Sequence, residues 1–197
     1  SFRVEGDRIV AGTYGAAVVA AGGEALLRGI CPSDLKVPLE EFQKAGAAVD
    51  ADEKNRQIRI CMGKRPLPLL IKTEPYPGFP TDLQSPFMAF LATAQGTSYI
   101  EEQVFEGRFA TAKILEQMGA VIRTEDQRAV IEGHYPLKGA AVNACDLRGG
   151  AALMVAALAA EGDTFIGECH HIERGYEDIC RDMAALGAHI RWVGKDS

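Results

Sequence analysis

The chain has 197 residues, of which 47% are hydrophobic and 24% are charged, and its formal net charge is −6. A chain of this length can form one large domain or two small ones, burying about 70% of its unfolded surface. The negative charge argues against a nucleic-acid-binding protein. The longest apolar run, 151–160, is far shorter than the roughly 18 residues that span a bilayer, so a soluble protein without a membrane partner is expected.

The five cysteines are scattered along the chain, and four histidines accompany them. No two cysteines have the CxxC spacing that is typical of structural zinc sites. An odd number of dispersed cysteines is also atypical of a disulfide framework. The sequence therefore predicts no metal site, and it favours a reducing, cytoplasmic compartment.

The sequence contains an internal repeat. Three segments each have the pattern of an apolar helix, a glycine turn, a strand, an amphipathic helix and a Gly-Ala pair before another strand. The turn glycine and the Gly-Ala glycine are 23, 23 and 25 residues apart, at Gly23 and Gly46, Gly96 and Gly119, and Gly162 and Gly187. An aspartate precedes each turn glycine by 16, 14 and 16 residues: Asp7, Asp82 and Asp146. We predict a single α/β domain, 1–197, of three units at about 1–66, 67–137 and 138–197.

The two helices of each unit differ in pattern. The first is apolar on nearly all sides, as in 147–161, which predicts a fully buried helix. The second has one apolar stripe, which predicts one solvent-exposed face. The glycines that follow the second helices are expected in the left-handed conformation that ends a helix. The stripes are Leu35, Leu39 and Phe42; Ala112, Leu115 and Met118; and Tyr176, Ile179, Cys180, Met183 and Leu186.

The expected strands are distributed unequally among the units. The third unit lacks the final hairpin partner of the other two, so we expect a missing strand, an open sheet edge and a fragment of a longer protein. The predicted strands are 26–30, 48–50 and 56–60 in the first unit; 69–72, 97–101, 121–124 and 129–132 in the second; and 140–144, 164–167 and 189–192 in the third.

The segment 75–82 contains three prolines and one glycine, which predicts a stiff, irregular loop. The loop ends at Thr81 and Asp82, directly before an apolar run at 83–94. One interpretation is that Asp82 caps the helix that follows. The other is that the loop presents this carboxylate to a substrate. The spacing alone favours the cap.

Four segments, taken in order, carry a family resemblance. They are Thr73-Glu-Pro-Tyr-Pro-Gly-Phe-Pro-Thr-Asp-Leu-Gln84, Val104-Phe-Glu-Gly-Arg-Phe109, Cys145-Asp-Leu-Arg148 and His171-Ile-Glu-Arg-Gly-Tyr-Glu177. Together they resemble the UDP-N-acetylglucosamine enolpyruvyl (carboxyvinyl) transferases over essentially the whole chain. The resemblance implies an inside-out α/β barrel domain of three βαβαββ units, with helices inside and sheets outside. It covers the C-terminal domain only. The N-terminal domain, with its reactive cysteine loop, is missing, as is one strand of the last unit.

The reaction implied by this resemblance moves the enolpyruvyl group of phosphoenolpyruvate to the 3′-hydroxyl of UDP-N-acetylglucosamine, the first committed step of peptidoglycan synthesis. No metal or organic cofactor is implied. The chemistry needs a base for the hydroxyl, an acid for the vinyl carbon and cations around phosphate and carboxylate. The chain alone is expected to be inactive, because half of the cleft and the cysteine loop belong to the other domain.

The resemblance assigns roles to particular residues. Asp82 is the implied catalytic base, Arg174 the arginine that moves onto phosphoenolpyruvate, and Val104 a backbone contact to the nucleotide sugar. Plainer alternatives exist: a helix cap for Asp82 and Asp146, an ion pair within their own turn for Asp146 and Arg148, and a surface ion pair with Glu173 or Glu177 for Arg174. The remaining candidates for substrate binding are Asp146, Arg148, Thr81, Phe105 and Arg108, although Arg108 could simply start the next helix.

Two other functions remain open. A shikimate-pathway enolpyruvyl transferase would share the fold but lack the 76–82 loop and the Glu-Arg-Gly-Tyr-Glu motif at 173–177. A non-catalytic domain that kept the fold is favoured only by departures from the family pattern. Gly107 stands where asparagine is frequent, and Gly149 and Gly150 replace alanine or serine, which is expected to loosen the backbone. Cys61 lies near a Gly-Lys-Arg-Pro sequence, but its spacing predicts a strand-end residue rather than the reactive cysteine.

Overall fold

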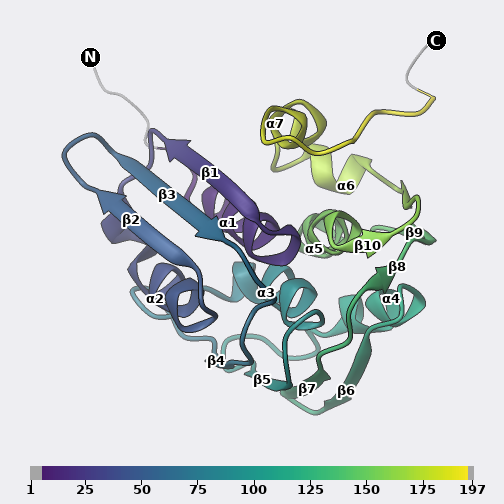
Figure 1. The fold of residues 1–197 in the computed structure, drawn as a ribbon. Coiled ribbons are helices and arrows are strands. Elements are labelled where there is room, and N and C mark those ends of the chain that lie inside the picture. The colour runs from purple at the N-terminus through teal and green to yellow at the C-terminus, as the bar shows by residue number, and fades with distance from the viewer. Residues whose placement is uncertain (1–5, 195–197) are drawn as a thin grey trace.

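The computed structural model describes residues 6–194 and has mixed helix and strand content, which confirms the predicted α/β class (Figure 1). Two short 3-10 helices, Pro32–Leu35 and Thr81–Leu83, precede α2 and α3. The helices are α1 Arg8–Ala21, α2 Lys36–Lys44, α3 Gln84–Leu91, α4 Ala110–Gln117, α5 Leu147–Leu158, α6 His170–Glu173 and α7 Ile179–Ala185. The strands are β1 Gly23–Arg28, β2 Ala48–Asp52, β3 Gln57–Met62, β4 Leu70–Lys72, β5 Thr97–Glu101, β6 Val121–Glu125, β7 Arg128–Glu132, β8 Leu137–Lys138, β9 Ala141–Asn143, β10 Ala160–Glu161 and β11 Phe165–Gly167.

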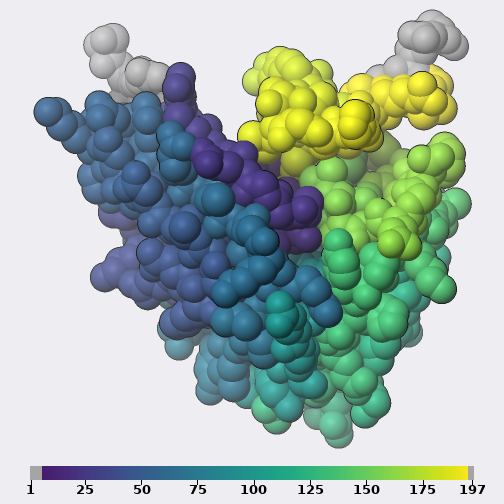
Figure 2. Space-filling view, viewed as in Figure 1, coloured from purple at the N-terminus to yellow at the C-terminus, as the bar shows by residue number. Residues whose placement is uncertain are grey.

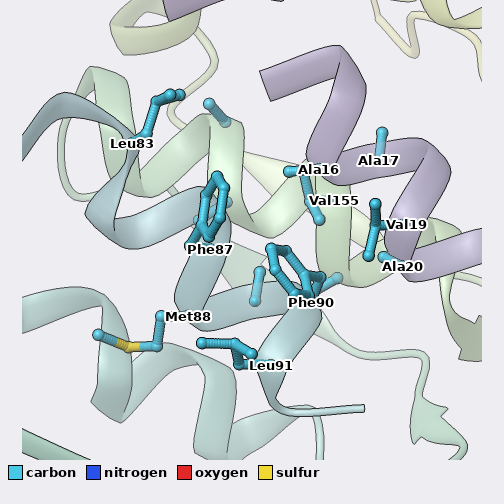
Figure 3. Close-up of a cluster of buried hydrophobic side chains, with 14 of the residues drawn as sticks. Ala16, Ala17, Val19, Ala20, Leu83, Phe87, Met88, Phe90, Leu91 and Val155 are labelled. Carbon is cyan, nitrogen blue, oxygen red and sulfur yellow. The ribbon is translucent and has the colours of Figure 1, made fainter. Parts of the chain in front are cut away.

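Three apolar helices form the centre of the molecule. Helices α1, α3 and α5 contact one another, and the sheets lie around them (Figure 1). Helices α1 and α3 pack together, and Ala16 and Ala20 of α1 belong to the same buried cluster as Phe87 and Phe90 of α3 (Figure 3). Every residue of α3 is buried, including the polar Gln84 and Ser85, as its almost wholly apolar pattern predicts. The arrangement has the helices inside and the sheets outside.

The second predicted unit forms a complete βαβαββ sequence, β4-α3-β5-α4-β6-β7. Its sheet has the order β4-β5-β7-β6, in which β4 and β5 are parallel and the other pairs antiparallel. The first unit forms an antiparallel sheet of order β1-β3-β2, with Ala25 opposite Ile60. In both sheets alternate residues are buried against the helices, as in β3, where Ile58 and Ile60 are fully buried.

The third unit contains two short parallel pairs, β8 with β10 and β9 with β11. The predicted strand at 189–192 is wrong, because these residues form no strand. Ile190 and Trp192 instead pack, partly buried, against the core. Among residues 6–194, no strand is hydrogen-bonded to this segment. A groove separates β1 from the C-terminal segment (Figure 2), and Ala17, Leu158 and Met183 are among its lining residues.

Several element boundaries differ from the prediction for local reasons. Strand β1 begins at Gly23 rather than residue 26 and ends at Arg28, because Gly29 has a φ of 82°. The apolar run at 147–161 ends its helix at Leu158, and Ala160–Glu161 forms β10. The glycines expected to end the amphipathic helices have positive φ, which confirms that prediction: Gly46 at 100°, Gly119 at 87° and Gly187 at 97°. Among residues 6–194, no helix combines the length and apolar character that a membrane crossing requires.

Candidate functional site

The proline-rich loop is a compact turn fixed on the core. The Glu74 amide donates a 2.9 Å hydrogen bond to the Phe79 carbonyl, and the Gly78 amide donates one of 2.8 Å to the Pro75 carbonyl. Phe79 is only 3% exposed, and its ring meets Phe87 of α3 edge-on at a centroid distance of 4.7 Å. Edge-to-face aromatic contacts of this kind stabilise beyond simple burial. The backbone that leads to Asp82 is therefore held in place by packing as well as by proline.

Asp82 does not cap a helix. It lies within the 3-10 helix Thr81–Leu83, and neither that helix nor α3 receives a side-chain cap. Its Oδ1 accepts a 2.7 Å bond from Nη2 of Arg108, and its Oδ2 accepts a 3.2 Å bond from Nη2 of Arg148. The capping interpretation of Asp82 is therefore wrong, and the carboxylate is available for interactions with arginines or a ligand.

The aspartates at the equivalent positions of the other two units behave differently. Asp7 accepts hydrogen bonds from the first free amides of α1. Asp146 Oδ1 accepts a 2.7 Å bond from the Gly149 amide and caps α5. Capping is thus the observed role of Asp7 and Asp146. Of these three aspartates, Asp82 is the one whose carboxylate does not cap a helix.

The charge state of Asp82 is set by two opposing effects. Partial burial by itself would raise the pKa of the carboxyl group. The charge and hydrogen bond of Arg148, and then those of Arg108, outweigh burial and lower the pKa below its ordinary value. Asp82 is therefore ionised at neutral pH, and its two oxygens are paired with cations.

Arg108 connects two of the motifs found in the sequence. It does not start a helix, since α4 begins at Ala110. Besides its bond to Asp82, its Nη1 donates a 3.2 Å hydrogen bond to Oγ1 of Thr81. Its guanidinium also lies 4.9 Å above the ring of Phe105, which is 53% exposed. The 104–109 motif is thereby joined to the end of the proline-rich loop.

Arg148 connects the third motif to the same carboxylate. It pairs with Asp82 rather than with Asp146, so the alternative of an ion pair within its own turn is wrong. On its other side Arg148 lies close to the hydroxyl of Tyr176, which hydrogen-bonds Oγ1 of Thr13 at 2.8 Å. Burial raises the pKa of Tyr176, and Thr13 and the charge of Arg148 partly oppose the rise. Arg148 therefore lies between a carboxylate and a phenol.

Arg174 is not drawn into this cluster. It is exposed at the end of α6, and its guanidinium forms no ion pair or hydrogen bond with another of residues 6–194. The alternative of a pair with Glu177 is wrong, because that carboxylate lies 3.8 Å from Arg181. The following Gly175 sits directly against Leu147, where a Cβ would lie 2.7 Å from Leu147 Cδ2. The segment that carries Arg174 therefore packs on the turn that carries Arg148.

The three glycine departures have structural reasons. Gly107 has a φ of 68°, a conformation in which asparagine is the best-tolerated substitute for glycine. Gly149 and Gly150 are buried in the first turn of α5. A Cβ on Gly149 would lie 2.7 Å from Cys145 Sγ, and one on Gly150 would lie 2.4 Å from Ile172 Cγ1, so close packing explains the lack of a side chain at both positions. The expected loosening of the backbone there stays a prediction.

Sequence reasoning missed Glu102, which is 1% exposed and hydrogen-bonds both the 104–105 backbone and Thr81. Its neighbour Glu101 forms surface ion pairs with Lys72 and Arg128, and nothing local distinguishes the two glutamates in sequence.

Within the described residues no group of three or more His, Cys, Asp or Glu side chains could hold a metal ion. Within residues 6–194 none of the five cysteines takes part in a disulfide bond, and Cys61 lies in β3 as predicted.

The fold and this cluster of arginines around a loop carboxylate define an enolpyruvyl transferase domain. The family model described as EPSP synthase (3-phosphoshikimate 1-carboxyvinyltransferase) matches residues 1–183, and the chain belongs to this family. Its relatives include a UDP-N-acetylglucosamine 1-carboxyvinyltransferase of Desulfofundulus thermocisternus, 45% identical over 93% of this chain and 75% of that protein. The protein of the same name from Brucella ovis is 42% identical over 97% of this chain. These relatives confirm the resemblance found in the sequence.

Solved structures agree with the fold. The enolpyruvyl transferase NikO from Streptomyces tendae superposes with a TM-score of 0.84 at 30% identity, over 95% of this chain. An EPSP synthase from Acinetobacter baumannii superposes with a TM-score of 0.72 at 20% identity, which supports the fold alone. The chain spans 44% of the Brucella ovis protein and 44% of NikO, less than half of either.

Proposed function

We propose that this chain is the C-terminal domain of an enzyme that transfers the enolpyruvyl group of phosphoenolpyruvate to the 3′-hydroxyl of UDP-N-acetylglucosamine. The observation that carries the proposal is the state of Asp82. This carboxylate sits at the end of a rigid loop, caps no helix and is paired with two arginines from two other motifs. Such a group can accept the hydroxyl proton while the arginines receive the anionic substrate.

The arginines and Asp82 would act in sequence on binding. Arginine grips phosphate or carboxylate with two parallel bonds, so an arriving phosphoenolpyruvate competes with Asp82 for Arg108 and Arg148. As Arg108 and Arg148 exchange their bonds to Asp82 for bonds to the substrate, they lower the pKa of Asp82 less, and that pKa rises. Asp82 then becomes a stronger base for the sugar hydroxyl when both substrates are in place.

The other candidates complete this half of the cleft. Val104 and Phe105 lie next to Arg108, and we assign them to the nucleotide sugar. Arg174 has its guanidinium uncommitted in the described part of the chain, so we assign it to phosphoenolpyruvate. Asp146 caps α5 and fixes the start of the helix that carries Arg148. We assign the opposite wall to an N-terminal domain of the same protein.

We also propose that the repeat units at about 1–66, 67–137 and 138–197 form one domain, whose outermost residues 1–5 and 195–197 lie outside the described part. A cytoplasmic location in peptidoglycan synthesis follows from the proposed reaction. The odd number and scattered placement of the five cysteines support a reducing compartment.

The proposal is tested on the full-length protein by measuring phosphate release from phosphoenolpyruvate. With UDP-N-acetylglucosamine as the acceptor, phosphate is expected to be released, whereas shikimate 3-phosphate in its place should give none. The reverse preference would establish the shikimate-pathway reaction instead. Absence of release with either acceptor would favour the non-catalytic domain. The 197-residue chain alone is expected to be inactive with both.

A further inference from the structure

A buried carboxylate outside the reacting groups connects the three segments that meet at the site. Glu102 follows β5 directly and is 1% exposed. Its Oε1 accepts hydrogen bonds from Thr73 Oγ1 at 2.8 Å, the Val104 amide at 3.0 Å and the Phe105 amide at 3.1 Å. Its Oε2 accepts a 2.8 Å bond from Thr81 Oγ1. Four donors from three separate segments therefore converge on one side chain.

Two of the partners of Glu102 make further hydrogen bonds, one to the neighbouring backbone and one to the candidate site. Thr73 Oγ1, besides donating to Glu102, accepts a 2.8 Å bond from the Gln103 amide. Thr81 Oγ1 also accepts the bond from Arg108, and Thr81 directly precedes Asp82. Through these contacts Glu102 lies one residue away from the proposed base on one side. On the other side it lies at the backbone of Val104.

A carboxylate suits this position for a chemical reason. It offers acceptor sites on both oxygens and no hydrogen that would compete with the amide donors. Burying an ionised group is costly unless hydrogen bonds satisfy it, and here four donors do so. Hydrogen bonds to a charged acceptor are stronger than those between neutral groups, so they restrict how far the donor segments can move relative to one another.

We propose that Glu102 is a positioning residue for the sugar-nucleotide end of the site. It fixes the Thr81–Asp82 turn and the Val104–Phe105 backbone relative to each other, so that the base and the sugar contacts keep one spacing. This inference rests on the proposed function for what the two segments bind. It goes beyond that proposal because it assigns the alignment of these two segments to Glu102, a residue to which the proposed function gives no contact with either substrate.

The experiment uses the full-length protein with Glu102→Ala and Glu102→Gln, and Ser98→Ala as a matched control. Ser98 is a fully buried residue of β5, and its hydroxyl accepts a 3.2 Å hydrogen bond from the Leu69 amide. Its replacement therefore removes a buried hydrogen bond from the strand that leads to Glu102, away from the site. Steady-state phosphate release gives kcat and a KM for each substrate. Amide hydrogen exchange reports on 79–83 and 103–108.

Glu102→Ala is expected to lower kcat/KM about 100-fold, the size of effect that a small misplacement of binding groups produces. The rise in KM should be greater for UDP-N-acetylglucosamine than for phosphoenolpyruvate. Glu102→Gln keeps an acceptor oxygen for Thr73 and the two amides, and its amide can donate to Thr81 Oγ1. It should therefore restore kcat/KM to within about tenfold of the unaltered enzyme. Ser98→Ala should leave both KM values unchanged.

Several results would overturn the proposal. Unchanged KM values in Glu102→Ala, or changes no larger than those of Ser98→Ala, would reduce Glu102 to a stability role. Unaltered amide exchange at Val104 and Phe105 in Glu102→Ala would show that the carboxylate does not hold that backbone. If the unaltered enzyme releases no phosphate with either acceptor, the proposed function fails. The exchange measurement then decides by itself whether Glu102 aligns the two segments.

Discussion

Replacing Asp82 with asparagine separates its chemical contribution from its structural one, because the two have different expected magnitudes. The substitution keeps the shape and removes the charge that pairs with Arg108 and Arg148. The exposed fractions of these side chains are 38% for Asp82, 26% for Arg108 and 20% for Arg148. Partly exposed ion pairs are each worth up to about 1 kcal/mol, so the loss of both costs about 2 kcal/mol at most.

The catalytic loss should be larger. Removing a general base costs about 10²- to 10⁴-fold in rate, equivalent to about 2.7 to 5.5 kcal/mol of barrier. Domains have about 5 to 15 kcal/mol of stability, so a 2 kcal/mol loss leaves a folded-to-unfolded ratio above about 100. We expect Asp82→Asn to be folded and nearly inactive.

The assay measures phosphate release by the full-length variant together with its thermal unfolding. Asp7→Asn is the matched control, since Asp7 caps α1 and asparagine is an equally good cap. That control should retain wild-type turnover. A folded Asp82→Asn variant with kcat within tenfold of the wild type would refute the reasoning and remove Asp82 from the mechanism.

Three further predictions follow from the same contacts. Arg148→Gln removes the largest influence that lowers the pKa of Asp82, so the midpoint of an NMR titration of the Asp82 carboxyl carbon should move upward. Because the folded pKa is lowered, the stability contributed by ionised Asp82 is present above the unfolded pKa and lost as pH falls through the folded value. The variant should lose it at a higher pH, and equal midpoints would contradict this. Phe87→Ala should lower the free energy of unfolding, measured by urea titration, by about 3 to 5 kcal/mol, because this fully buried ring contacts three other rings. A loss below about 1 kcal/mol would show instead that the remaining rings repack. Gly107→Val should cost about 1 to 2 kcal/mol at its φ of 68°, and Gly107→Asn clearly less; equal costs would argue against backbone strain as the cause.

The sequence predicted those parts of the fold that have local causes. Strand β5 was predicted with the boundaries that the structure has, Thr97–Glu101, because its pattern and flanking turn are both local. The glycines that end the amphipathic helices were predicted because only a residue tolerant of positive φ fits there. The strand at 189–192 was predicted from its place in the repeat, after a Gly-Ala pair. A strand also needs a hydrogen-bonded neighbour, and the repeat pattern does not show whether one is present.

The candidate site was less predictable because its contacts are long-range. Asp82 and Asp146 look alike in sequence, yet one pairs with arginines and the other caps a helix. The difference depends on Arg108, which lies 26 residues from Asp82 in sequence, and on Arg148, which lies 66 residues away. Glu102 had no sequence signal at all, since its role depends on Thr73 and Thr81 reaching it from other segments.

The anchoring of the proline-rich loop by Phe79 has a thermodynamic consequence for ligand recognition. Because the ring is buried against Phe87 in the free chain, the ordering entropy of this loop is lost on folding rather than on binding. A molecule that docks against Asp82 thus meets a surface whose shape is already set. If the proposed N-terminal domain faces this loop, any closing movement can be confined to that domain, and inhibitors shaped to the Asp82 side should gain affinity from rigidity.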